Sequence, residues 1–439
     1  MPRPTLTWPG RGDPVIRDEV SGRWRFGARA AAVPRLRASS RHGKNPRPLT
    51  DANLLIHGEA MDALRALAPT HAGRFRLCYI DPPFNTGNDF EDYEDRADES
   101  VWLAALEERL AAARVLLAAN GFLVVHVNEL QQAHLRVLLD ETWGADARVA
   151  QIAWQRAPDR TVLGQGHTLV PDHLEYLLVY AAGGAPAGWP RPQRVQPLPE
   201  KTLTTYSRTL VPSAKSTLVD EFSDGAGARV RIHVHSGYTL ERIPAATLRA
   251  ATSDASVLSD RFDRLMRTTN QQPESTFQQA LLARMPLRDT LYRAEFTQRR
   301  GKHAGSRSRF YLNNNVVLWL RDVARLEAGR LVRVADLDNL WTADEIPVTG
   351  VAGEGGVSFR RGKKPERLLQ RVIEAFSLPD DWILDFFGGS GTTAAVAERL
   401  GRRWVLVEAG AHALTHCAPR LLRSLRPTSG FVLGTVLPI

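Results

Sequence analysis

Short apolar runs and amphipathic helical segments alternate in the first half of the chain. The apolar runs lie at Asn53–His57, Phe75–Ile80 and Gly121–Val127. Between them, Glu59–Leu67 and Trp102–Ala119 space their apolar residues as on one face of a helix. Because strands and helices take turns, this stretch predicts a parallel sheet covered by helices.

The alternation fades in the middle of the chain and returns near its end. A further helix and two strands are predicted at Glu129–Glu141, Val149–Gln155 and His173–Tyr180. Near the C-terminus, Lys364 and Pro365 introduce a helix that runs to Phe376. The elements predicted after it are strands at Trp382–Phe386 and Trp404–Glu408, helices at Thr392–Leu400 and Ala411–Leu425, and a last edge strand at Phe431–Leu437.

Residues 181–340 have a different texture, with Pro/Gly-rich linkers, Ser/Thr-rich stretches and short mixed strands. This texture predicts a separate, irregular α+β insertion. The predicted organisation is a basic arm at 1–50, one α/β half at 51–180, the insertion at 181–340 and a second α/β half at 341–439.

The apolar run before residue 81 ends in Asp81, Pro82, Pro83 and Phe84. The two prolines restrict the backbone of this turn, so its carboxylate and its aromatic ring have little freedom. One interpretation is a strand that simply stops, because Pro cannot extend a ladder and Asp favours turns. The other is a rigid loop that carries chemistry, and a second motif more than 300 residues away favours it.

This second motif, DFFGGSGTT at Asp385–Thr393, lies between a predicted strand and a predicted helix. Its glycines allow a ligand to approach the backbone, and N–H groups at the helix start face an anion. Neither the GxGxxG fingerprint nor a P-loop is present, so phosphate is not the obvious ligand. Glu408, after the next strand, is placed to bind a ribose, although a plain surface acid is the alternative. S-adenosylmethionine, with a carboxylate, a ribose and an adenine, satisfies both features.

Composition favours a folded, soluble protein. The 439 residues are 43% hydrophobic, which suffices for one large or two to three ordinary domains. No apolar stretch reaches the roughly 18 residues of a membrane helix and no signal peptide is evident, so we expect a cytoplasmic protein. Cys78 and Cys417 lie outside any CxxC or Cys/His cluster, which indicates neither a disulfide framework nor a zinc site.

Positive charge is concentrated at the N-terminus. Residues 1–50 contain 11 Lys or Arg and 3 Asp or Glu, and so hold most of the formal net charge of +9. With Trp8, Trp24 and Phe26 among the arginines, the arm is expected to lie along a phosphate backbone and to stack on bases or wedge between them. A flexible basic tail without a fixed partner is the alternative.

A second basic segment, Arg299–Tyr311, lies in the insertion. It has five Lys or Arg residues, no acid and two aromatic residues at its end. Contact with phosphates and base edges is expected, and an exposed, solvated loop is the alternative. The candidate DNA-binding residues are Arg299, Arg300, Lys302, Arg307 and Arg309.

In this order, DPPFNTG and DFFGGSGTT resemble the amino-methyltransferases of DNA in the β arrangement, in which the catalytic motif precedes the cofactor motif. The stretches NLLIHGEAMDALRAL, GFLVVHVNELQQAHL, DHLEYLLVYA and KKPERLLQRVI are similar to the same family, especially modification subunits of type III restriction systems and their solitary relatives. The resemblance covers roughly residues 53–180 and 340–430. It departs from the commoner pattern at Glu59, where Asp is usual, and in the region 181–340.

The resemblance implies an α/β fold, a Rossmann-like S-adenosylmethionine-dependent methyltransferase with an inserted α+β target-recognition domain. In the loop of residues 81–84, Asp81 and the Pro82 carbonyl would accept the two hydrogens of the target amine. Phe84 would stack on a base flipped out of the duplex. The residues implied to hold the cofactor are Asp385, Phe387, Gly388, Gly389, Ser390 and Gly391 for its methionine part, Thr392 near its carboxylate, Glu408 at its ribose, and Lys364 and Pro365 beside it.

The function so implied is site-specific methyl transfer from S-adenosylmethionine to an exocyclic amine of DNA. Asp as the first residue of the loop, and the likeness to type III modification subunits, favour adenine N6 over cytosine N4. An RNA or small-molecule methyltransferase and a non-catalytic DNA-binding protein are the remaining alternatives. Expected partners are double-stranded DNA, a second copy of the chain and a restriction subunit, with no metal and no membrane, and the expected location is the cytoplasm, at the nucleoid.

Overall fold

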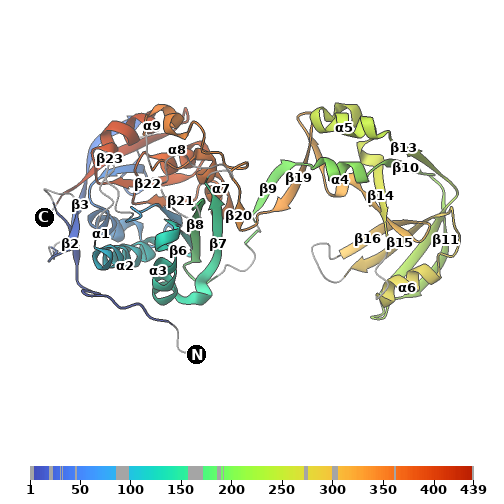
Figure 1. Cartoon of the computed structure of the whole chain (residues 1–439), viewed down its shortest axis with the longest axis horizontal. Coiled ribbons are helices and arrows are strands. Elements are labelled where there is room, and N and C mark those ends of the chain that lie inside the picture. The colour runs from blue at the N-terminus through green and yellow to red at the C-terminus, as the bar shows by residue number, and fades with distance from the viewer. Residues whose placement is uncertain are drawn as a thin grey trace. The chain divides into compact units, whose positions relative to one another are not determined.

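The computed structural model divides into two compact units (Figure 1), one formed by residues 1–192 and 337–439 and the other by Gln193–Asp336. The first unit therefore joins the two ends of the chain, and the second falls within the region 181–340. The described residues are 4–18, 23–29, 31, 33–44, 47–85, 98–156, 172–184, 189–190, 192–270, 275–298, 305–359 and 362–437.

The first unit is built on a mixed sheet. Its strands within the described ranges are β3 (Arg35–Gly43), β4 (Asn53–His57), β5 (Phe75–Ile80), β6 (Leu117–Asn128), β7 (Arg148–Gln155), β8 (Leu174–Ala181), β20 (Leu340–Trp341), β21 (Trp382–Asp385), β22 (Arg403–Glu408) and β23 (Gly430–Leu437). They lie in the order β20-β7-β8-β6-β5-β21-β22-β4-β23-β3. From β6 to β23 neighbouring strands are parallel, whereas β8 is antiparallel to β6.

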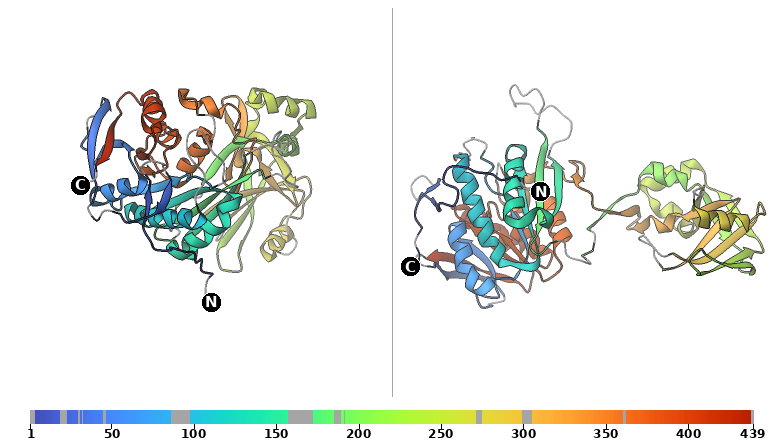
Figure 2. Two further views of the ribbon diagram at one scale, coloured as in Figure 1. Left: turned by 60° about the vertical axis from the view of Figure 1, so that its left-hand side comes forward. Right: turned by 90° about the horizontal axis from the view of Figure 1, so that it is seen from below.

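Helices cover both faces of this sheet (Figure 2). One buried cluster contains apolar residues of α1 (Ala60–His71), α2 (Glu99–Leu116) and α3 (Glu129–Leu139). The cluster on the other face contains residues of α7 (Glu366–Phe376), α8 (Thr392–Arg399) and α9 (Ala418–Ser424). Parallel strands buried on both faces read as continuous apolar runs, as the sequence showed. The predicted Rossmann-like α/β fold is confirmed.

Two loops meet where the strand order reverses. β5 continues through α2 to β6 on one side, whereas β21 continues through α8 to β22 on the other. β5 and β21 are parallel neighbours, with Leu77 opposite Ile383 and Cys78 opposite Leu384. Loops that leave adjacent strands in opposite directions open a crevice at the carboxyl edge of the sheet, where ligands bind in open α/β folds.

The N-terminal arm is part of the first unit. β1 (Val15–Arg17) and β2 (Trp24–Phe26) form an antiparallel ribbon. Trp8, Trp24 and Phe26 pack beside Val15 and the start of α2. Apolar contacts therefore hold these half-buried rings against the protein, and their stacking on bases stays a prediction.

Ion pairs hold the same ribbon. Arg11 lies 2.8 Å from carboxylate oxygens of both Glu107 and Glu141, and Arg29 lies 2.6 Å from Glu108. The alternative of a tail without a fixed partner is therefore wrong for the described part of the arm.

The place of one strand in the sheet and the end of one helix differ from the sequence expectation. Phe431–Leu437 was expected at an edge of the sheet, but β23 pairs with β4 on one side and with β3 of the arm on the other. The helix expected to end before Pro69 continues to His71. Pro69 lies in the last turn of α1, so the hydrogen bond that its missing N–H cannot donate is lost near the end of the helix and not in its middle.

The second unit is an α+β body. Its helices in the described segments are α4 (Glu200–Thr205), α5 (Ala245–Ser253) and α6 (Thr276–Ala283). An antiparallel sheet has the order β11-β12-β15-β16-β17-β14-β10-β13, and a smaller one the order β18-β19-β9. The strands are β9 (Gln193–Pro197), β10 (Arg208–Pro212), β11 (Ser216–Ser223), β12 (Arg229–His235), β13 (Tyr238–Arg242), β14 (Leu265–Thr269), β15 (Leu291–Gln298), β16 (Gly305–Leu312), β17 (Asn315–Trp319), β18 (Arg325–Glu327) and β19 (Arg330–Asp336).

The structure also shows the state of the two cysteines and allows a search for membrane-spanning helices and for clusters of metal ligands. Cys78 and Cys417 are buried and free. Within the part of the chain that the structure describes, no helix has the length and apolarity needed to cross a membrane. In the same residues, no group of three or more His, Cys, Asp or Glu side chains is arranged to hold a metal ion.

A buried ion pair links the arm to the sheet edge. Arg109 of α2 is fully buried and donates to the Glu59 carboxylate, and its guanidinium lies 4.9 Å from the centre of the Trp24 ring. Glu59 also caps α1 by accepting from the backbone N–H groups of Met61, at 2.6 Å, and Asp62, at 3.3 Å. The glutamate that replaces the commoner aspartate therefore joins three elements.

Arg109→Met tests this pair. The change leaves a largely buried carboxylate without its cation, so we expect the free energy of unfolding to fall by about 3 kcal/mol, measured by urea denaturation. Arg114→Met removes an exposed arginine of the same helix, which donates to the Thr142 carbonyl and lies over the Trp143 ring, and is expected to cost less, about 1 kcal/mol. Equal losses in the two variants would show that the buried pair adds nothing.

Candidate active site

Three carboxyl groups lie at the carboxyl ends of three neighbouring parallel strands. Asp81 directly follows β5, Asp385 ends β21, and Glu408 ends β22. Asp81 and Glu408 both act electrostatically on Asp385, so the three carboxyls lie near one another at this edge of the sheet. The sequence predicted each of these residues, and the pairing of β5 with β21 brings them together.

The loop after β5 is held rigidly. Trp102 of α2 donates its indole N–H to the Pro83 carbonyl at 2.7 Å. Asp81 is largely buried, and burial raises the pKa of its carboxyl. The Lys364 ammonium lies 3.1 Å from Asp81 Oδ1 and opposes that shift of the pKa. The same ammonium lies 4.5 Å from the centre of the Phe84 ring.

The glycine loop after β21 depends on close backbone approach. A side chain at Gly388 would have its Cβ 2.9 Å from the Val407 carbonyl oxygen of the neighbouring strand. Gly389 and Gly391 have φ values of +51° and +78°, which side chains rarely adopt, and Gly391 immediately precedes α8. Only glycine fits these three positions without strain.

Glu408 fastens that loop. Its two carboxylate oxygens accept from the backbone N–H groups of Gly389 and Gly410, each at 2.7 Å. A carboxylate offers about four acceptor sites, so both oxygens keep capacity for hydroxyl donors.

Asp385 is a buried acid that forms no ion pair with any Lys, Arg or His among the described residues. Burial raises the pKa of its carboxyl to about 7, while hydrogen bonds from the Thr393 hydroxyl and from the Phe387 N–H, the latter at 2.9 Å, act in the opposite direction. The negative charges of Asp81 and Glu408 add to the increase. A positively charged ligand in the crevice would therefore be stabilised by all three acids.

A buried arginine of α9 donates hydrogen bonds to the glycine loop. Arg420 of α9 is fully buried and donates to the hydroxyl of Thr392 at 2.7 Å and to that of Ser390 at 3.1 Å. Its other amino group donates to Glu366 at 2.6 Å. Thr392 stays a predicted neighbour of the cofactor's carboxylate, and in the structure its hydroxyl accepts from Arg420.

Lys364 and Pro365 lie at the start of α7, with Pro365 as the residue before the helix. Lys364, which the sequence predicts beside the cofactor, lies 3.1 Å from Asp81 and 3.4 Å from Glu175 of β8. Glu175, His126 and Arg420 were missed by sequence reasoning. The first two carried a signal, because a charged or polar residue inside an apolar strand is rarely buried without a partner, whereas Arg420 is one arginine among many.

The candidate DNA-binding residues of the insertion divide into two groups. Arg299, Arg300 and Lys302 lie outside the described residues. Arg307 and Arg309 are half-buried on β16, and their β15 neighbours in register are Phe296 and Ala294, which belong to a buried cluster.

The opposite face of this sheet is polar and carries basic residues that the sequence did not single out. Arg231, His233 and Arg293 alternate with the buried residues of β12 and β15. Arg231 pairs with Glu221 at 3.2 Å, and both His233 and Arg293 pair with Glu295, at 3.5 and 2.9 Å.

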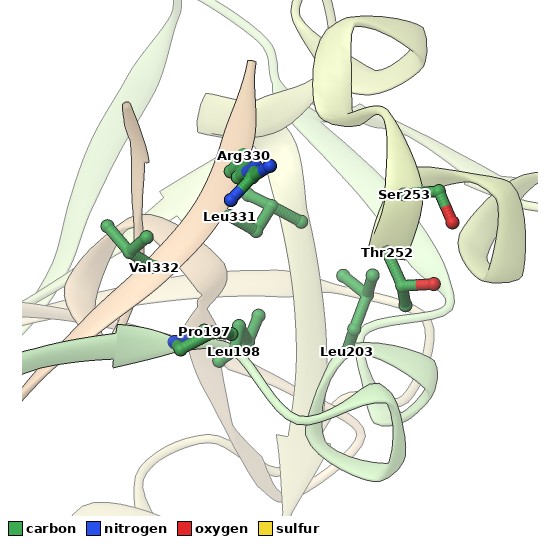
Figure 3. A pocket seen from close by; sticks show the side chains of 8 residues that line it. All are labelled: Pro197, Leu198, Leu203, Thr252, Ser253, Arg330, Leu331 and Val332. Carbon is green, nitrogen blue, oxygen red and sulfur yellow. The ribbon is translucent and has the colours of Figure 1, made fainter. Parts of the chain in front are cut away.

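The second unit also contains a pocket of about 250 Å³ between β9, β19 and α5 (Figure 3). It is lined by Pro197, Leu198, Leu203, Thr252, Ser253, Arg330, Leu331 and Val332. Its walls are mostly aliphatic and hold a single charged side chain, so it offers no acid–base pair for chemistry.

Comparisons with known proteins agree with the motifs. A family model described as DNA methylase matches residues 75–418. The chain is 27% identical over 402 residues to the "Probable type III restriction-modification enzyme HindVI Mod subunit" of Haemophilus influenzae, covering 88% of this chain and 52% of that protein. It is 25% identical over 375 residues to the type III restriction-modification enzyme StyLTI Mod subunit of Salmonella typhimurium, covering 78% of this chain and 49% of that protein.

The chain thus spans about half the length of these curated relatives. Among solved structures, the cytosine-N4-specific PvuII DNA methyltransferase aligns with a TM-score of 0.39 and 12% identity, covering 89% of this chain and 91% of that one.

The protonation of Asp385 makes a prediction for stability. The folded protein keeps this proton up to about pH 7, whereas an unfolded chain releases it near pH 4. The group therefore weakens the fold as the pH rises between these values. Asp385→Asn removes this loss, so its free energy of unfolding relative to the parent should rise from pH 5 to pH 8 in urea titrations. Asp13→Asn, at an exposed position, is the control; a difference between Asp385→Asn and the parent that stays constant with pH would contradict the raised pKa.

Proposed function

Because the chain belongs to the DNA methylase family, we propose that it transfers a methyl group from S-adenosylmethionine to an exocyclic amine of DNA, adenine N6 in preference to cytosine N4. The observation that carries this proposal is the group of three carboxyls at the switch point of the sheet, the place where ligands bind in open α/β folds. S-adenosylmethionine fits such a site, because it carries an ammonium and a sulfonium, both positive.

Different residues at this edge of the sheet bind different parts of the cofactor. Asp385 is the acid best placed to bind the ammonium, since it is buried and has no basic partner within the part of the chain that the structure describes. Glu408 keeps acceptor capacity for the ribose hydroxyls while it holds Gly389 in place. The cofactor supplies a methyl group bonded to a positive sulfur, and the products are S-adenosylhomocysteine, the methylated amine and a proton.

Asp81 acts on the target amine. The lone pair of that amine is delocalised into the base, so it is a poor nucleophile until the nitrogen becomes more tetrahedral. An ionised Asp81 and the Pro82 carbonyl accept the two N–H hydrogens and so favour that geometry. Phe84 stacks on the base, which must leave the duplex to reach the loop. Fixed acceptors in a largely buried site supply most of the rate through positioning and electrostatics.

The second unit and the arm supply the DNA contacts. In the second unit, the polar face of β12 and β15 offers Arg231, His233 and Arg293, which suit phosphates and base edges. In the first unit, the part of the basic arm proposed to hold the DNA, here called the clamp, is β3. Arg35, Arg37 and Arg41 are exposed on this strand. The region 181–340 is accordingly the target-recognition domain of the proposal.

The relatives suggest further partners. Both are named as Mod subunits of restriction-modification enzymes. A restriction subunit, a second copy of the chain and a location at the nucleoid are therefore parts of this proposal. Cytosine N4 is the alternative target, because its amine has the same chemistry and the loop would serve it equally.

Asp81→Ala tests the catalytic loop. Loss of an acceptor at the reacting nitrogen is expected to lower methyl transfer at least about 100-fold, measured as labelled methyl groups in duplex DNA, with S-adenosylmethionine still bound in calorimetry. Full methyl transfer by the variant would remove the catalytic role from this loop.

Identification of the methylated nucleoside shows which base is the target. Digestion of DNA methylated by the parent protein and separation of its nucleosides should yield N6-methyladenine. Recovery of N4-methylcytosine in its place would overturn the preference for adenine.

Replacing Arg35, Arg37 and Arg41 with alanine tests the clamp. Each lost phosphate contact reduces the salt dependence of binding by roughly one unit of slope, so the triple variant should lose about three. Affinity should fall alike for all duplex sequences, while cofactor binding stays unchanged. A parent-like salt slope in fluorescence anisotropy would exclude β3 from the DNA interface.

A further inference from the structure

Lys364, from the C-terminal half of the first unit's sequence, bridges two acids of its N-terminal half. Its ammonium lies 3.1 Å from Asp81 Oδ1 and 3.4 Å from Glu175 Oε2. The side chains of Lys364 and Glu175 are 10% and 6% exposed, so water screens these contacts weakly. The lysine, which precedes α7 in the C-terminal part of the chain, thus reaches across to the loop after β5.

Glu175 is itself fixed by groups on the sheet. Its carboxylate lies 2.8 Å from His126 Nε2 of β6 and 3.0 Å from an Arg156 amino group beyond β7. His126 Nδ1 lies 2.9 Å from the Tyr79 hydroxyl of β5. Burial alone would raise the pKa of Glu175, but Lys364 and His126 hold it well below its ordinary value. Glu175 is therefore a permanent anion that anchors the lysine.

The task of Asp81 requires a negative charge. A protonated carboxyl would donate a hydrogen bond with one oxygen, where the target amine needs acceptors. Burial favours the protonated form of Asp81, and the nearby charge of Glu175 favours it further. Lys364 and His126 favour the ionised form, and Lys364 has the larger influence.

We propose that Lys364, anchored by Glu175, is a positioning residue that keeps the Asp81 carboxylate ionised and directed at the target amine. This inference rests on the proposed function, since it assigns the support of the same catalytic group. It gives Lys364 a role in the catalytic loop in place of the contact with the cofactor that the sequence implied.

The titratable groups that surround Asp81 come from every element around it. They are Tyr79 of β5, His126 of β6, Glu175 of β8, Asp385 of β21 and Lys364 before α7. Removal of Lys364 and removal of the Glu175 charge shift the pKa of Asp81 in opposite directions. Loss of Lys364 removes a stabilising cation, whereas loss of the Glu175 charge removes a repelling anion.

The test compares the pH dependence of methyl transfer in three variants. In Lys364→Met the acid limb of the kcat profile should move to higher pH, and each unit of that shift lowers kcat about tenfold on the limb. In Glu175→Gln the limb should move to lower pH. Lys364→Arg, which keeps the charge, should restore the limb towards its parent position.

The neighbouring lysine provides a matched control. Lys363 donates to the carbonyls of Ala352 and Val357, at 3.1 and 2.9 Å, and does not bridge the two acids. Lys363→Met should leave the acid limb in place, whatever it does to stability. If it moves the limb as far as Lys364→Met does, the proposal is overturned.

Two measurements independent of turnover complete the test. Infrared difference spectra between Lys364→Met and Lys364→Met/Asp81→Asn at neutral pH should contain the band of a protonated carboxyl, which the parent and its Asp81→Asn variant should lack. Calorimetry should give Lys364→Met the parent affinity for S-adenosylmethionine. A weakened affinity with an unmoved acid limb would make Lys364 a cofactor ligand and overturn the proposal.

The outcomes separate this inference from the proposed function. If Asp81→Ala keeps methyl transfer, the catalytic assignment itself fails. If Asp81→Ala abolishes methyl transfer while Lys364→Met and Glu175→Gln keep the parent acid limb, only the role of Lys364 fails.

Discussion

The parallel pairing of β5 with β21 is the constraint on which the rest of the molecule depends. It joins residues 75–80 to 382–385 and so brings two loops from distant parts of the sequence to one edge of the sheet. Each strand is buried on both faces, with the helices of the N-terminal half on one side and those of the C-terminal half on the other. Neither half can bury its strands alone, and the crevice exists only when both are folded together.

Buried charges also hold the carboxyl edge of the sheet together. Three buried basic side chains there each have an acid as partner. Arg109 with Glu59, Arg420 with Glu366 and Lys364 with Asp81 and Glu175 tie loops to helices at the carboxyl edge. Removing one member of such a pair leaves the other charge buried, which is expensive. Asp385 differs from these acids because it has no basic partner among the described residues. The proposed cofactor supplies that positive charge.

Much of the fold of the first unit could be predicted, because parallel strands buried on both faces are apolar throughout and end in recognisable turns. The strands Asn53–His57 and Phe75–Ile80 agree with their sequence predictions residue for residue. The candidate carboxyls were found for the same reason, since Asp81, Asp385 and Glu408 all follow such runs. The site-residue roles themselves stay predictions.

The rest could not be read from local sequence, because it depends on contacts between distant residues. Nothing near Lys364 indicates that it reaches Asp81, and nothing near Trp24 indicates that Arg109 lies over its ring. The basic arm gives the impression of a tail because its arginines dominate its composition, while their acidic partners lie on α2 and beyond it. β23 was taken for an edge strand because its outer neighbour, β3, comes from that arm.

The most direct test of the central claim is a crystal structure of the chain with S-adenosylhomocysteine and a duplex that carries its target. The two halves meeting at β5 and β21 predict one position for the ligand, with its amino group at Asp385, its ribose at Glu408 and its sulfur towards Asp81 and a flipped base. A ligand bound elsewhere, or one whose sulfur points away from Asp81, would contradict the account.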